Sequence, residues 1–418
     1  MNHIKAIDFL ESLNAFGIKP GLERITRLLA ALGTPQSKYK TIHVAGTNGK
    51  GSVCAMLSKI LSTAGLKVGL FTSPHLIDYR ERIKIDDVMI KPSDFDDEIG
   101  RVKKIIDEIV ADGGESPTQF EALTAMALDY CSRNGVKYAV IEVGLGGLLD
   151  STNVITPAVS VITNVGWDHA DRCGGTLEGI ARHKAGIIKK NIPVVTAARG
   201  EPLRIIEEAA KKLSAPLYVV DENNFIPPVR LNLKGEYQRE NAAVAIKAAE
   251  LLNEPSITPT IIADALEHVQ WAGRFEIFSI DGRTIIIDGA HNPDGARALR
   301  QSLDAQFPDR PRKFLFGVLG DKDFDTMIDV LFRPSDEVIV TRPNSERAAD
   351  PSVVCRRLKC NSIRAEPIEN LNDAFNAWIE GKGGNDTIEG NGGNDTILIA
   401  AGSLYMIGAV RKQLGMRN

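Results

Sequence analysis

The sequence predicts an α/β protein with two doubly wound domains, the first of them carrying a phosphate-binding loop. Three observations predict this class. Strand-like and helix-like segments alternate along almost the whole chain. A strand, a glycine-rich turn and a helix follow one another over 41–64. The alternation restarts after Asp288, which predicts domains at 1–290 and 291–418 and a ligand cleft between them.

The first elements are predicted from apolar periodicity. The segment before residue 22 is amphipathic, and Leu22–Leu32 reads as a helix. Thr41–Ala45 is β-branched and apolar, which is typical of a buried strand, and Val53–Ala64 carries a helical apolar stripe. A second strand follows at Lys67–Phe71, whereas the polar stretch Thr72–Asp87 is predicted to be an irregular loop.

The middle of the chain continues the same alternation. Val136–Val143 and Pro157–Thr163 are apolar throughout, as expected of interior strands in a parallel sheet. Short strands are predicted at Val194–Thr196 and Leu217–Val220. The predicted helices are Ser93–Val110, Gln119–Cys131, Leu177–Ile188, Pro202–Leu213 and the alanine-rich Gln238–Leu252.

The last third of the chain repeats the pattern on a smaller scale. Strands are predicted at Ile285–Asp288, Lys313–Val318, Glu337–Thr341 and Ile397–Ala401. Helices are predicted at Pro293–Ala305, Asp325–Leu331, Pro351–Leu358 and Ser403–Gln413.

Composition is that of an ordinary globular protein. The chain has 418 residues, 43% hydrophobic and 25% charged, with a formal net charge of −4, so neither a nucleic-acid nor a membrane surface is indicated. No stretch has the length of a transmembrane helix or the apolar core of a signal peptide. The five cysteines are odd in number and form no C-x-x-C pair, which favours reduced thiols and a cytoplasmic location.

The turn after the first strand has the chemistry of a phosphate cradle. Glycines let backbone N–H groups approach an anion, the helix N-terminus adds its dipole, and Lys50 supplies charge while Ser52 can reach Mg²⁺. The spacing departs from G-x-x-x-x-G-K-[ST] because Gly51 separates Lys50 from Ser52. The alternative is a glycine-rich turn with an incidental lysine.

Side chains at three strand ends suggest a metal site. Glu142 ends one apolar strand, His169 follows the next, and Ser73 follows Lys67–Phe71. This sparse, mostly oxygen set suits Mg²⁺ better than Zn²⁺, although imidazole is not a favoured Mg²⁺ ligand. The alternatives are a salt-bridged Glu142 and a histidine satisfied within the fold.

Motifs spread over nearly the whole chain, among them HVAGTNGKGS (43–52), KAGIIK (184–189) and GSLY (402–405), resemble those of the folylpolyglutamate synthase/dihydrofolate synthase family, a branch of the Mur ligase superfamily. Single motifs would be weak, whereas this many in one order are specific. The resemblance implies a P-loop ATPase domain, with a mostly parallel sheet, and a Rossmann-like C-terminal glutamate-ligase domain. The matching motifs are PGLERI (20–25), HVAGTNGKGS (43–52), TSPHL (72–76), RERI (80–83), PTQFEALT (117–124), EVGLGG (142–147), DSTNVI (150–155), DH (168–169), TLEGIA (176–181), KAGIIK (184–189), YQRENAA (237–243), GRFE (273–276), DGAHNPDG (288–295), LGDKD (319–323) and GSLY (402–405).

The resemblance implies an ATP-dependent ligase that adds L-glutamate to folates, and to dihydropteroate, through an acyl phosphate. Lys50, Lys184 and His291 match catalytic positions, and Lys184 matches a lysine that the family carbamylates. Two Mg²⁺ ions are implied, with a monovalent cation as a further candidate. The implied metal ligands are Ser52, Ser73, Glu142, His169 and Lys184, and the implied ATP contacts are Gly46, Thr47, Asn48, Gly49, Lys50, Gly51, Ser52, Asn241, Arg274 and Asp288.

The acceptor substrates are assigned by the same resemblance. Thr118, Phe120, Asp150 and Ser151 match the folate side of the site, and His291 and Ser403 match the glutamate side. The partners implied are small molecules (ATP, L-glutamate, and folate or dihydropteroate), and the family leads us to expect a monomer. For Phe120 the alternative is a core aromatic side chain, and for Lys184 it is a surface lysine.

The sequence departs from the family pattern at three positions. Leu148 stands where bifunctional bacterial members are expected to carry arginine, which weighs against dihydropteroate ligation more than against polyglutamylation. His183 replaces the usual Glu before Lys184, and we hypothesise an altered pH dependence of carbamylation. Ala272 replaces a usual proline.

Residues 381–398 form a tandem nonapeptide, GKGGNDTIE-GNGGNDTIL. It resembles the calcium-binding repeat of parallel β-rolls, but two turns are too few for a stable stack. The prediction is a duplicated glycine-rich surface loop, with a calcium-responsive protein as the alternative. Two further functional alternatives stay open, another Mur-type amino-acid ligase and a catalytically inactive nucleotide-binding module.

Overall fold

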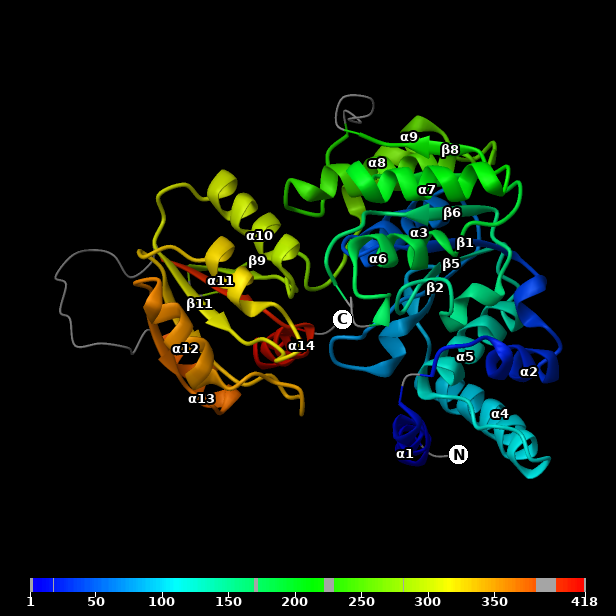
Figure 1. The fold of residues 1–418 in the computed structure, drawn as a ribbon, viewed down its shortest axis with the longest axis horizontal. Helices are drawn as coiled ribbons and strands as arrows, with labels where there is room; N and C mark the ends of the chain where they lie inside the picture. Colours follow the sequence, from blue (N-terminus) through cyan, green and yellow to red (C-terminus); the bar gives the residue numbers. More distant parts are fainter. Residues whose placement is uncertain are drawn as a thin grey trace. The chain divides into compact units, whose positions relative to one another are not determined.

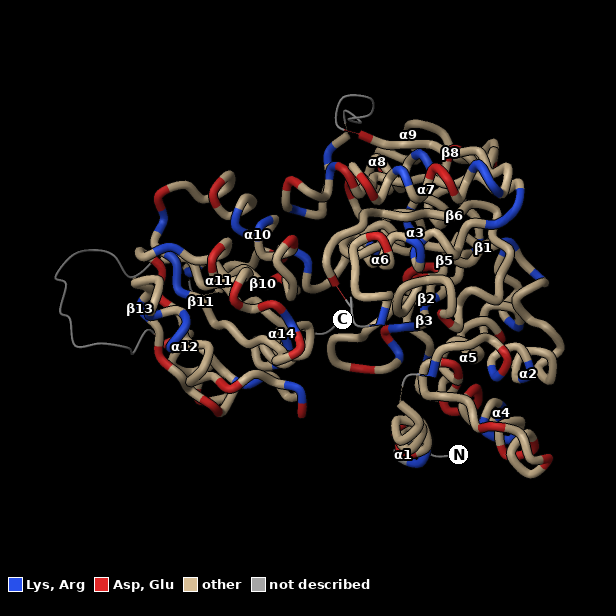
Figure 2. The backbone as a smooth tube through the Cα atoms, viewed as in Figure 1, with Lys and Arg blue, Asp and Glu red and all other residues tan. Residues whose placement is uncertain are grey.

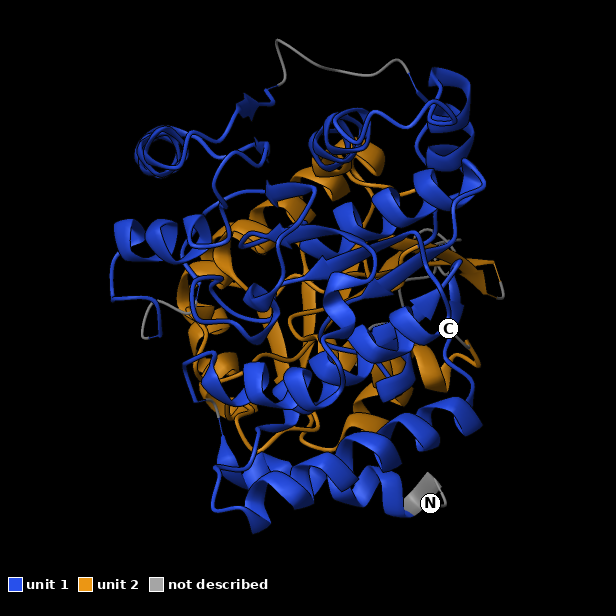
Figure 3. Ribbon diagram, turned by 90° about the vertical axis from the view of Figure 1, so that its right-hand side faces the viewer, with its two compact units in different colours: residues 1–232, 239–270 blue, residues 233–238, 271–418 orange. Residues whose placement is uncertain are grey.

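The chain folds into two compact units, shown in Figures 1 and 3. The computed structural model describes residues 3–17, 19–168, 172–221, 229–280, 282–380 and 396–416. Unit 1 comprises Met1–Asn232 and Arg239–Gln270, and unit 2 comprises Leu233–Gln238 and Trp271–Asn418. This division lies earlier than the predicted boundary at 290/291, because strands between residues 276 and 287 hydrogen-bond into the sheet of unit 2.

Unit 1 is built on an eight-stranded sheet in the order β4-β3-β2-β5-β1-β6-β7-β8. The pairs that link β2, β5, β1, β6, β7 and β8 are parallel, and β3 and β4 add an antiparallel edge. The central strands are buried on both faces, as continuous apolar runs predict. The strands are β1 (Lys40–Ala45), β2 (Val68–Phe71), β3 (Ile83–Ile85), β4 (Val88–Met89), β5 (Tyr138–Glu142), β6 (Val159–Ile162), β7 (Val194–Thr196) and β8 (Leu217–Val219).

Helices cover the sheet of unit 1, as Figure 1 shows. The helix that follows the glycine-rich turn, α3, packs on β1, β2 and β5 and against α9. A separate cluster centred on Phe71, Phe95 and Leu128 joins α1, α2, α4 and α5 to the sheet. The helices are α1 (His3–Ser12), α2 (Glu23–Ala31), α3 (Lys50–Thr63), α4 (Pro92–Ala111), α5 (Gln119–Arg133), α6 (Leu177–Ala185), α7 (Gly200–Lys212), α8 (Tyr237–Glu250) and α9 (Pro259–His268).

Unit 2 is a six-stranded sheet in the order β13-β12-β11-β14-β10-β9. All its pairs are parallel except β9 with β10, and its core is centred on Phe314, Phe316 and Leu331. The strands are β9 (Glu276–Ile280), β10 (Arg283–Ile287), β11 (Arg312–Phe316), β12 (Glu337–Val340), β13 (Arg364–Pro367) and β14 (Ile397–Ala401). The helices are α10 (Pro293–Gln306), α11 (Phe324–Leu331), α12 (Pro351–Cys360), α13 (Leu371–Glu380) and α14 (Leu404–Gln413).

The mixed α/β class and the mostly parallel sheets confirm the predicted fold. The irregular loop predicted over Thr72–Asp87 is wrong in part, because Asp78 and Glu81 cap a short 3₁₀ helix and β3 follows it directly. The sequence prediction also missed α9, β9, β13 and α13. For α9 a signal was present, since Thr258 caps the helix and a proline opens it.

The predicted nonapeptide repeat falls largely outside the described residues, which resume at 396. Figure 2 shows acidic and basic residues interspersed along both units, consistent with the small net charge of −4. In the part of the chain that the structure describes, no helix is long and apolar enough to span a membrane.

Candidate active site

The glycine-rich turn between β1 and α3 is shaped by its first glycine. Gly46 has φ +154°, and a Cβ at this position would lie 1.8 Å from Thr163 Oγ1. That hydroxyl donates to the Asn48 carbonyl oxygen across 2.6 Å, so the end of β6 is bonded directly to the turn. Only glycine therefore fits at position 46.

The second glycine brings a distant helix to the turn. Gly49 has the left-handed φ of +83° immediately before α3 begins at Lys50. A Cβ on Gly49 would lie 2.3 Å from Oδ1 of Asn241 in α8. The predicted ATP contact Asn241 is thus placed against the predicted phosphate turn within unit 1.

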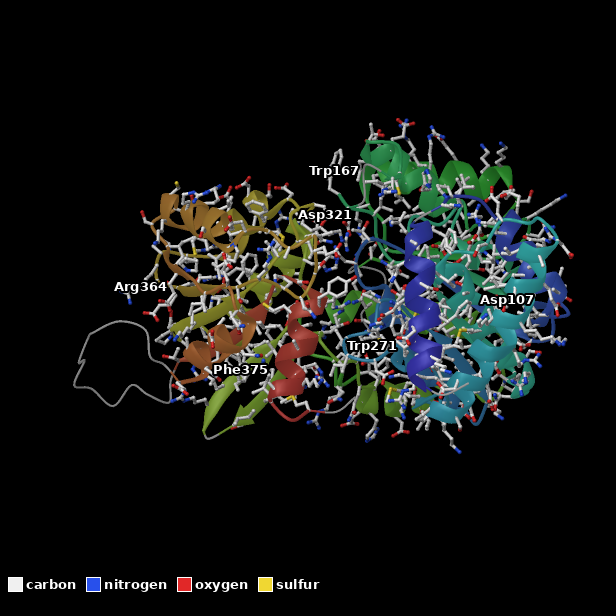
Figure 4. The ribbon with its side chains drawn as sticks, turned by 90° about the horizontal axis from the view of Figure 1, so that it is seen from below. Asp107, Trp167, Trp271, Asp321, Arg364 and Phe375 are labelled. Carbon is white, nitrogen blue, oxygen red and sulfur yellow. The ribbon has the colours of Figure 1, made fainter. Side chains whose placement is uncertain are left out.

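A second segment, residues 163–166, is hydrogen-bonded to the turn. The Asn48 N–H donates to Asn164 Oδ1 at 2.9 Å, and the Gly166 N–H donates to Thr47 Oγ1 at 2.9 Å. The next residue, Trp167, is 56% exposed (Figure 4). Asn164 was not predicted as a site residue, although it lies two residues after the end of β6, just as Ser73 lies two residues after the end of β2.

Two lysines converge on one backbone oxygen. Lys50 Nζ donates to the Gly46 carbonyl oxygen at 3.1 Å, and Lys184 Nζ, from α6, donates to the same oxygen at 2.8 Å. Burial, and then the nearby charge of Lys50, lower the pKa of Lys184 to about 7. Lys184 is therefore a buried amine with a large neutral population at physiological pH, and the surface-lysine alternative does not apply.

Oxygen-bearing side chains lie beside the turn. Glu142, buried at the end of β5, accepts a hydrogen bond from the Ser73 N–H at 3.0 Å, and Ser52 is buried in the first turn of α3. Burial and then the Glu142 carboxylate raise the pKa of Cys54, whereas Lys50 opposes them, so both charges act on the start of α3. His169 lies outside the described residues. Within the described ranges, no group of three or more His, Cys, Asp or Glu side chains is placed to hold a metal.

The predicted folate residues form one neighbourhood in unit 1. The Phe120 ring stacks on Phe71 with centroids 5.9 Å apart, and a Cβ on Gly144 would lie 2.4 Å from the Phe120 ring. The Thr118 side chain accepts a hydrogen bond from the Glu121 N–H and so caps α5. In return, the Thr118 N–H donates to Glu121 Oε2 at 2.7 Å.

Asp150 and Ser151 are buried in the turn that follows Gly144. Asp150 accepts from the Leu145 N–H at 2.8 Å and from the Thr152 hydroxyl at 2.5 Å. Burial raises the pKa of Asp150, against these hydrogen bonds. The Ser151 hydroxyl lies 2.8 Å from Oγ1 of Thr124 in α5, so the turn is tied to the helix that carries Phe120.

The structure also shows the contacts of Leu148 and His183, two residues that depart from the family pattern. The Leu148 N–H donates to the His183 carbonyl oxygen at 2.8 Å, while the Leu148 side chain is 45% exposed. A Cβ on Gly146 would lie 3.3 Å from His183 Nδ1. Neither position was predicted to contact the other.

In unit 2, the predicted nucleotide residues gather at the end of β10. Asp288 accepts from the Phe275 and Ala290 N–H groups, each at 2.8 Å, and from the Tyr237 hydroxyl at 3.2 Å. Burial raises the pKa of Asp288, and the positive charge of Arg274 opposes that rise. A Cβ on Gly289 would lie 2.2 Å from Arg274 Nη1, which places the guanidinium against this turn.

The predicted glutamate residues follow two neighbouring strands. The His291 ring nitrogen Nδ1 lies 2.8 Å from the Gly289 carbonyl oxygen, after β10, and Ser403 precedes α14, after β14. Because β10 and β14 are parallel neighbours, their carboxyl ends meet. Ser403 Oγ is buried and has no hydrogen-bond partner among the described residues.

Comparison with known proteins covers both units. The Mur ligase middle domain matches residues 44–226, and the Mur ligase glutamate ligase domain matches residues 273–401. The chain is 34% identical to a dihydrofolate synthase/folylpolyglutamate synthase of Bacillus subtilis, covering 96% of each chain. It is 33% identical to a folylpolyglutamate synthase of Lacticaseibacillus casei, covering 99% of each. A Mycobacterium tuberculosis folylpolyglutamate synthase solved with ADP superposes over 100% of both chains with a TM-score of 0.92 and 30% identity.

Proposed function

The chain belongs to the folylpolyglutamate synthase/dihydrofolate synthase family of Mur ligases, and from this we propose that it is an ATP-dependent ligase that joins L-glutamate to folates. Tetrahydrofolate is the proposed main acceptor, and dihydropteroate is a second. One observation supports the proposal most directly. Lys50 and Lys184 both donate hydrogen bonds to the Gly46 carbonyl oxygen, inside the turn that the sequence predicts to bind phosphate.

The proposed reaction has two balanced steps. A carboxylate oxygen of the acceptor attacks the γ-phosphorus of ATP, and the bond to the β-phosphate oxygen breaks, which releases ADP. The neutral amine of L-glutamate then attacks the acyl carbon, phosphate leaves, and the amine loses a proton. Repulsion between the carboxylate and the triphosphate dominates the first barrier, so positive charge and N–H groups at the phosphates are the effective tools.

We assign the nucleotide contacts to individual residues, as the resemblance implies them. In unit 1 the backbone of residues 46–52 and the Lys50 ammonium would hold the phosphates, and Asn241 would contact the nucleotide beside Gly49. In unit 2 Arg274 would supply charge to a phosphate. Asp288 is held in place by three hydrogen bonds and would contact the nucleotide.

Most of the proposed metal ligands are oxygen donors, the type that Mg²⁺ prefers. Ser52, Ser73, Glu142 and His169 would contribute to two ions, and carbamylation of Lys184 would turn an amine into an oxygen ligand. Carbamylation requires a neutral amine, and the lowered pKa of Lys184 supplies one. When bound, Mg²⁺ would neutralise charge on the phosphates. A monovalent cation is part of the same proposal.

The acceptors are assigned to side chains that the fold gathers. In unit 1 the Phe120 ring would pack on the pterin, next to the turn that carries Asp150 and Ser151. Thr118 caps α5, the helix that carries Phe120. In unit 2 His291 and Ser403 would bind L-glutamate. The buried Ser403 hydroxyl without a partner among the described residues supports this role, because a ligand carboxylate would satisfy it. A cytoplasmic monomer with small-molecule partners completes the proposal.

The test is ADP release with Mg-ATP and L-glutamate, with tetrahydrofolate and dihydropteroate compared as acceptors. Turnover with tetrahydrofolate supports the proposal, and turnover with both indicates a bifunctional enzyme. Lys50→Met should abolish turnover. Lys59→Met is the matched control, since Lys59 lies on the same helix but pairs with Asp87 at 3.2 Å. Nucleotide binding without turnover on either acceptor would contradict the proposal and favour another Mur-type ligase or an inactive module.

The carbamate is tested separately. After removal of dissolved CO₂, the enzyme should regain activity on addition of bicarbonate. Lys184→Arg, which keeps a cation but cannot offer a neutral amine, should show no such recovery. Recovery in both proteins would contradict a carbamate on Lys184.

A further inference from the structure

A buried histidine in β1 is not used by the mechanism above. His43 lies three residues before Gly46 and is completely buried. In the sheet it stands opposite Ile141 of β5. Its Nε2 atom lies 2.8 Å from Oγ1 of Thr152.

The hydroxyl of Thr152 continues this contact to Asp150. Thr152 Oγ1 donates to Asp150 Oδ1 at 2.5 Å, and the Thr152 N–H donates to the same oxygen at 3.0 Å. The other carboxylate oxygen accepts from the Leu145 N–H at 2.8 Å. His43, Thr152, Asp150 and Leu145 thus form one continuous chain of hydrogen bonds, which we call the β1 relay.

The number of available protons determines which atom donates in each hydrogen bond of the β1 relay. A carboxylate can only accept, so the single hydroxyl proton of Thr152 is committed to Asp150. His43 must then donate through Nε2–H, which leaves Nδ1 without a proton. His43 Nδ1 is buried and has no hydrogen-bond partner among the described residues, so no acceptor there favours a proton on Nδ1. Burial, followed by the charge of Lys189, lowers the pKa of His43 to about 3, so the ring stays neutral.

The far end of the β1 relay reaches the surroundings of Phe120. Leu145 follows Gly144, and a Cβ on Gly144 would lie 2.4 Å from the Phe120 ring. Ser151, between Asp150 and Thr152, lies 2.8 Å from Thr124, which donates to the Phe120 carbonyl oxygen at 2.8 Å. The backbone against which the Phe120 ring packs is therefore connected by hydrogen bonds to His43 in β1.

We propose that His43 and Thr152 are positioning residues for the folate acceptor, because the β1 relay fixes Asp150 and the 144–150 turn beside Phe120. This rests on the proposed function, in which that turn contacts the acceptor. The relay begins on the strand that leads into the phosphate turn. One strand therefore supports both the nucleotide loop and the acceptor turn within unit 1.

Thr152→Val tests the β1 relay, because valine keeps the shape of threonine and removes only the hydroxyl. Leaving Asp150 and His43 without this partner is expected to raise the KM for the folate acceptor about tenfold, with the KM for ATP unchanged. Thr152→Ser restores the hydroxyl and should return the acceptor KM close to that of the unsubstituted protein. Ser160→Ala is the matched control, since its buried hydroxyl donates to the Ile187 carbonyl oxygen, outside the relay.

Nitrogen-15 NMR of the histidine rings gives a readout that does not depend on turnover. The His43 signals, identified by their loss in His43→Gln, should report a neutral Nε2–H ring from pH 5 to pH 8 and should shift in Thr152→Val. An Nδ1–H ring, an unchanged acceptor KM in Thr152→Val, or parallel rises in both KM values would overturn the positioning role. Failure of the unsubstituted protein to ligate any folate would instead overturn the proposed function, and this assignment with it.

Discussion

Lys184 Nζ donates to the Gly46 carbonyl oxygen across 2.8 Å, which joins α6 to the first glycine of the turn between β1 and α3. Lys50 Nζ donates to the same oxygen, so two amino groups compete for one acceptor in a buried place. Burial, and then the positive charge of Lys50, lower the pKa of Lys184, the lysine on α6.

The first prediction concerns the pH dependence of stability without CO₂. The pKa of Lys184 is about 7 in the folded protein, whereas an unfolded lysine titrates near ~10.4. Between these values the unfolded chain binds more protons, so this group makes the free energy of unfolding rise with pH. Lys184→Met should remove that rise.

Urea denaturation at pH 7 and pH 9 measures this effect as a difference between the two proteins. Lys211→Met, on an exposed position of α7, is the control and should keep the pH dependence of the unsubstituted protein. If Lys184→Met shows the same rise between pH 7 and pH 9 as the unsubstituted protein, Lys184 is not a buried amine with a lowered pKa.

The second prediction concerns the left-handed glycine. In Gly49→Ala the methyl group would meet Asn241 Oδ1 at 2.3 Å, and the left-handed φ of +83° adds about 1–2 kcal/mol of strain. We expect the affinity for ADP, measured by calorimetry, to fall at least about tenfold.

Gly100→Ala is the matched control for that substitution. Gly100 lies inside α4 with nothing within 4 Å of a Cβ, so alanine should stabilise the helix by about 0.5–1 kcal/mol and leave ADP binding unchanged. Wild-type ADP affinity in Gly49→Ala would show that the turn moves freely enough to accept a side chain.

Much of the fold could be predicted because its signals are local. Thr41–Ala45, the glycines after it and the apolar stripe of α3 lie within one short stretch, and each is governed by its immediate neighbours. The antiparallel hairpin of β9 and β10 shows the limit. The alternating burial of β9 is weak, with no residue of that strand fully buried, so this strand was not predicted.

The sequence proposes the candidate site residue by residue, but the contacts between these residues could not be predicted. The contact of Asn241 with Gly49 and the bond from His43 to Thr152 join residues far apart in sequence, and no periodicity reports them. Arg24 is a further example, since it pairs with the buried Glu121 at 3.1 Å and so holds the start of the helix that carries Phe120. Only packing of α2 on α5 creates that pair.

The third prediction concerns a buried carboxylate between α4 and α5. Glu98 pairs with Arg133 at 2.5 Å, and its pKa is raised to about 7 by burial and then by the Asp129 charge, which Arg133 opposes. An unfolded glutamate titrates near ~4.3, so this group stabilises the fold below that pH and loses its contribution as pH rises through 7.

Glu98→Gln should therefore flatten the fall in stability between pH 5 and pH 7.5, by a difference on the order of 1–3 kcal/mol. Glutamine can still accept from Arg133, so the packing of the two helices is kept. The measurement is urea denaturation at both pH values. An unchanged slope would mean that Glu98 is ionised throughout this range.

The fourth prediction concerns acceptor choice at Leu148. Its backbone is fixed by the N–H bond to the His183 carbonyl oxygen at 2.8 Å, while 45% of the residue is exposed, so arginine can replace leucine without disturbing the core. A guanidinium there would offer a hydrogen-bonding cation to the anionic dihydropteroate. We expect Leu148→Arg to raise the ratio of kcat/KM for dihydropteroate to that for tetrahydrofolate by about tenfold, which corresponds to ~1.4 kcal/mol.

Leu149→Arg separates a specific effect at position 148 from a general gain of positive charge. Leu149 is 43% exposed and adjacent in the chain, so the two variants have the same net charge and similar solvent access. If both variants raise the ratio equally, long-range attraction of an anionic acceptor explains the gain, and a rise in salt should abolish it. If only Leu148→Arg raises it, the side chain at 148 contacts the acceptor and contributes to the choice between dihydropteroate and tetrahydrofolate.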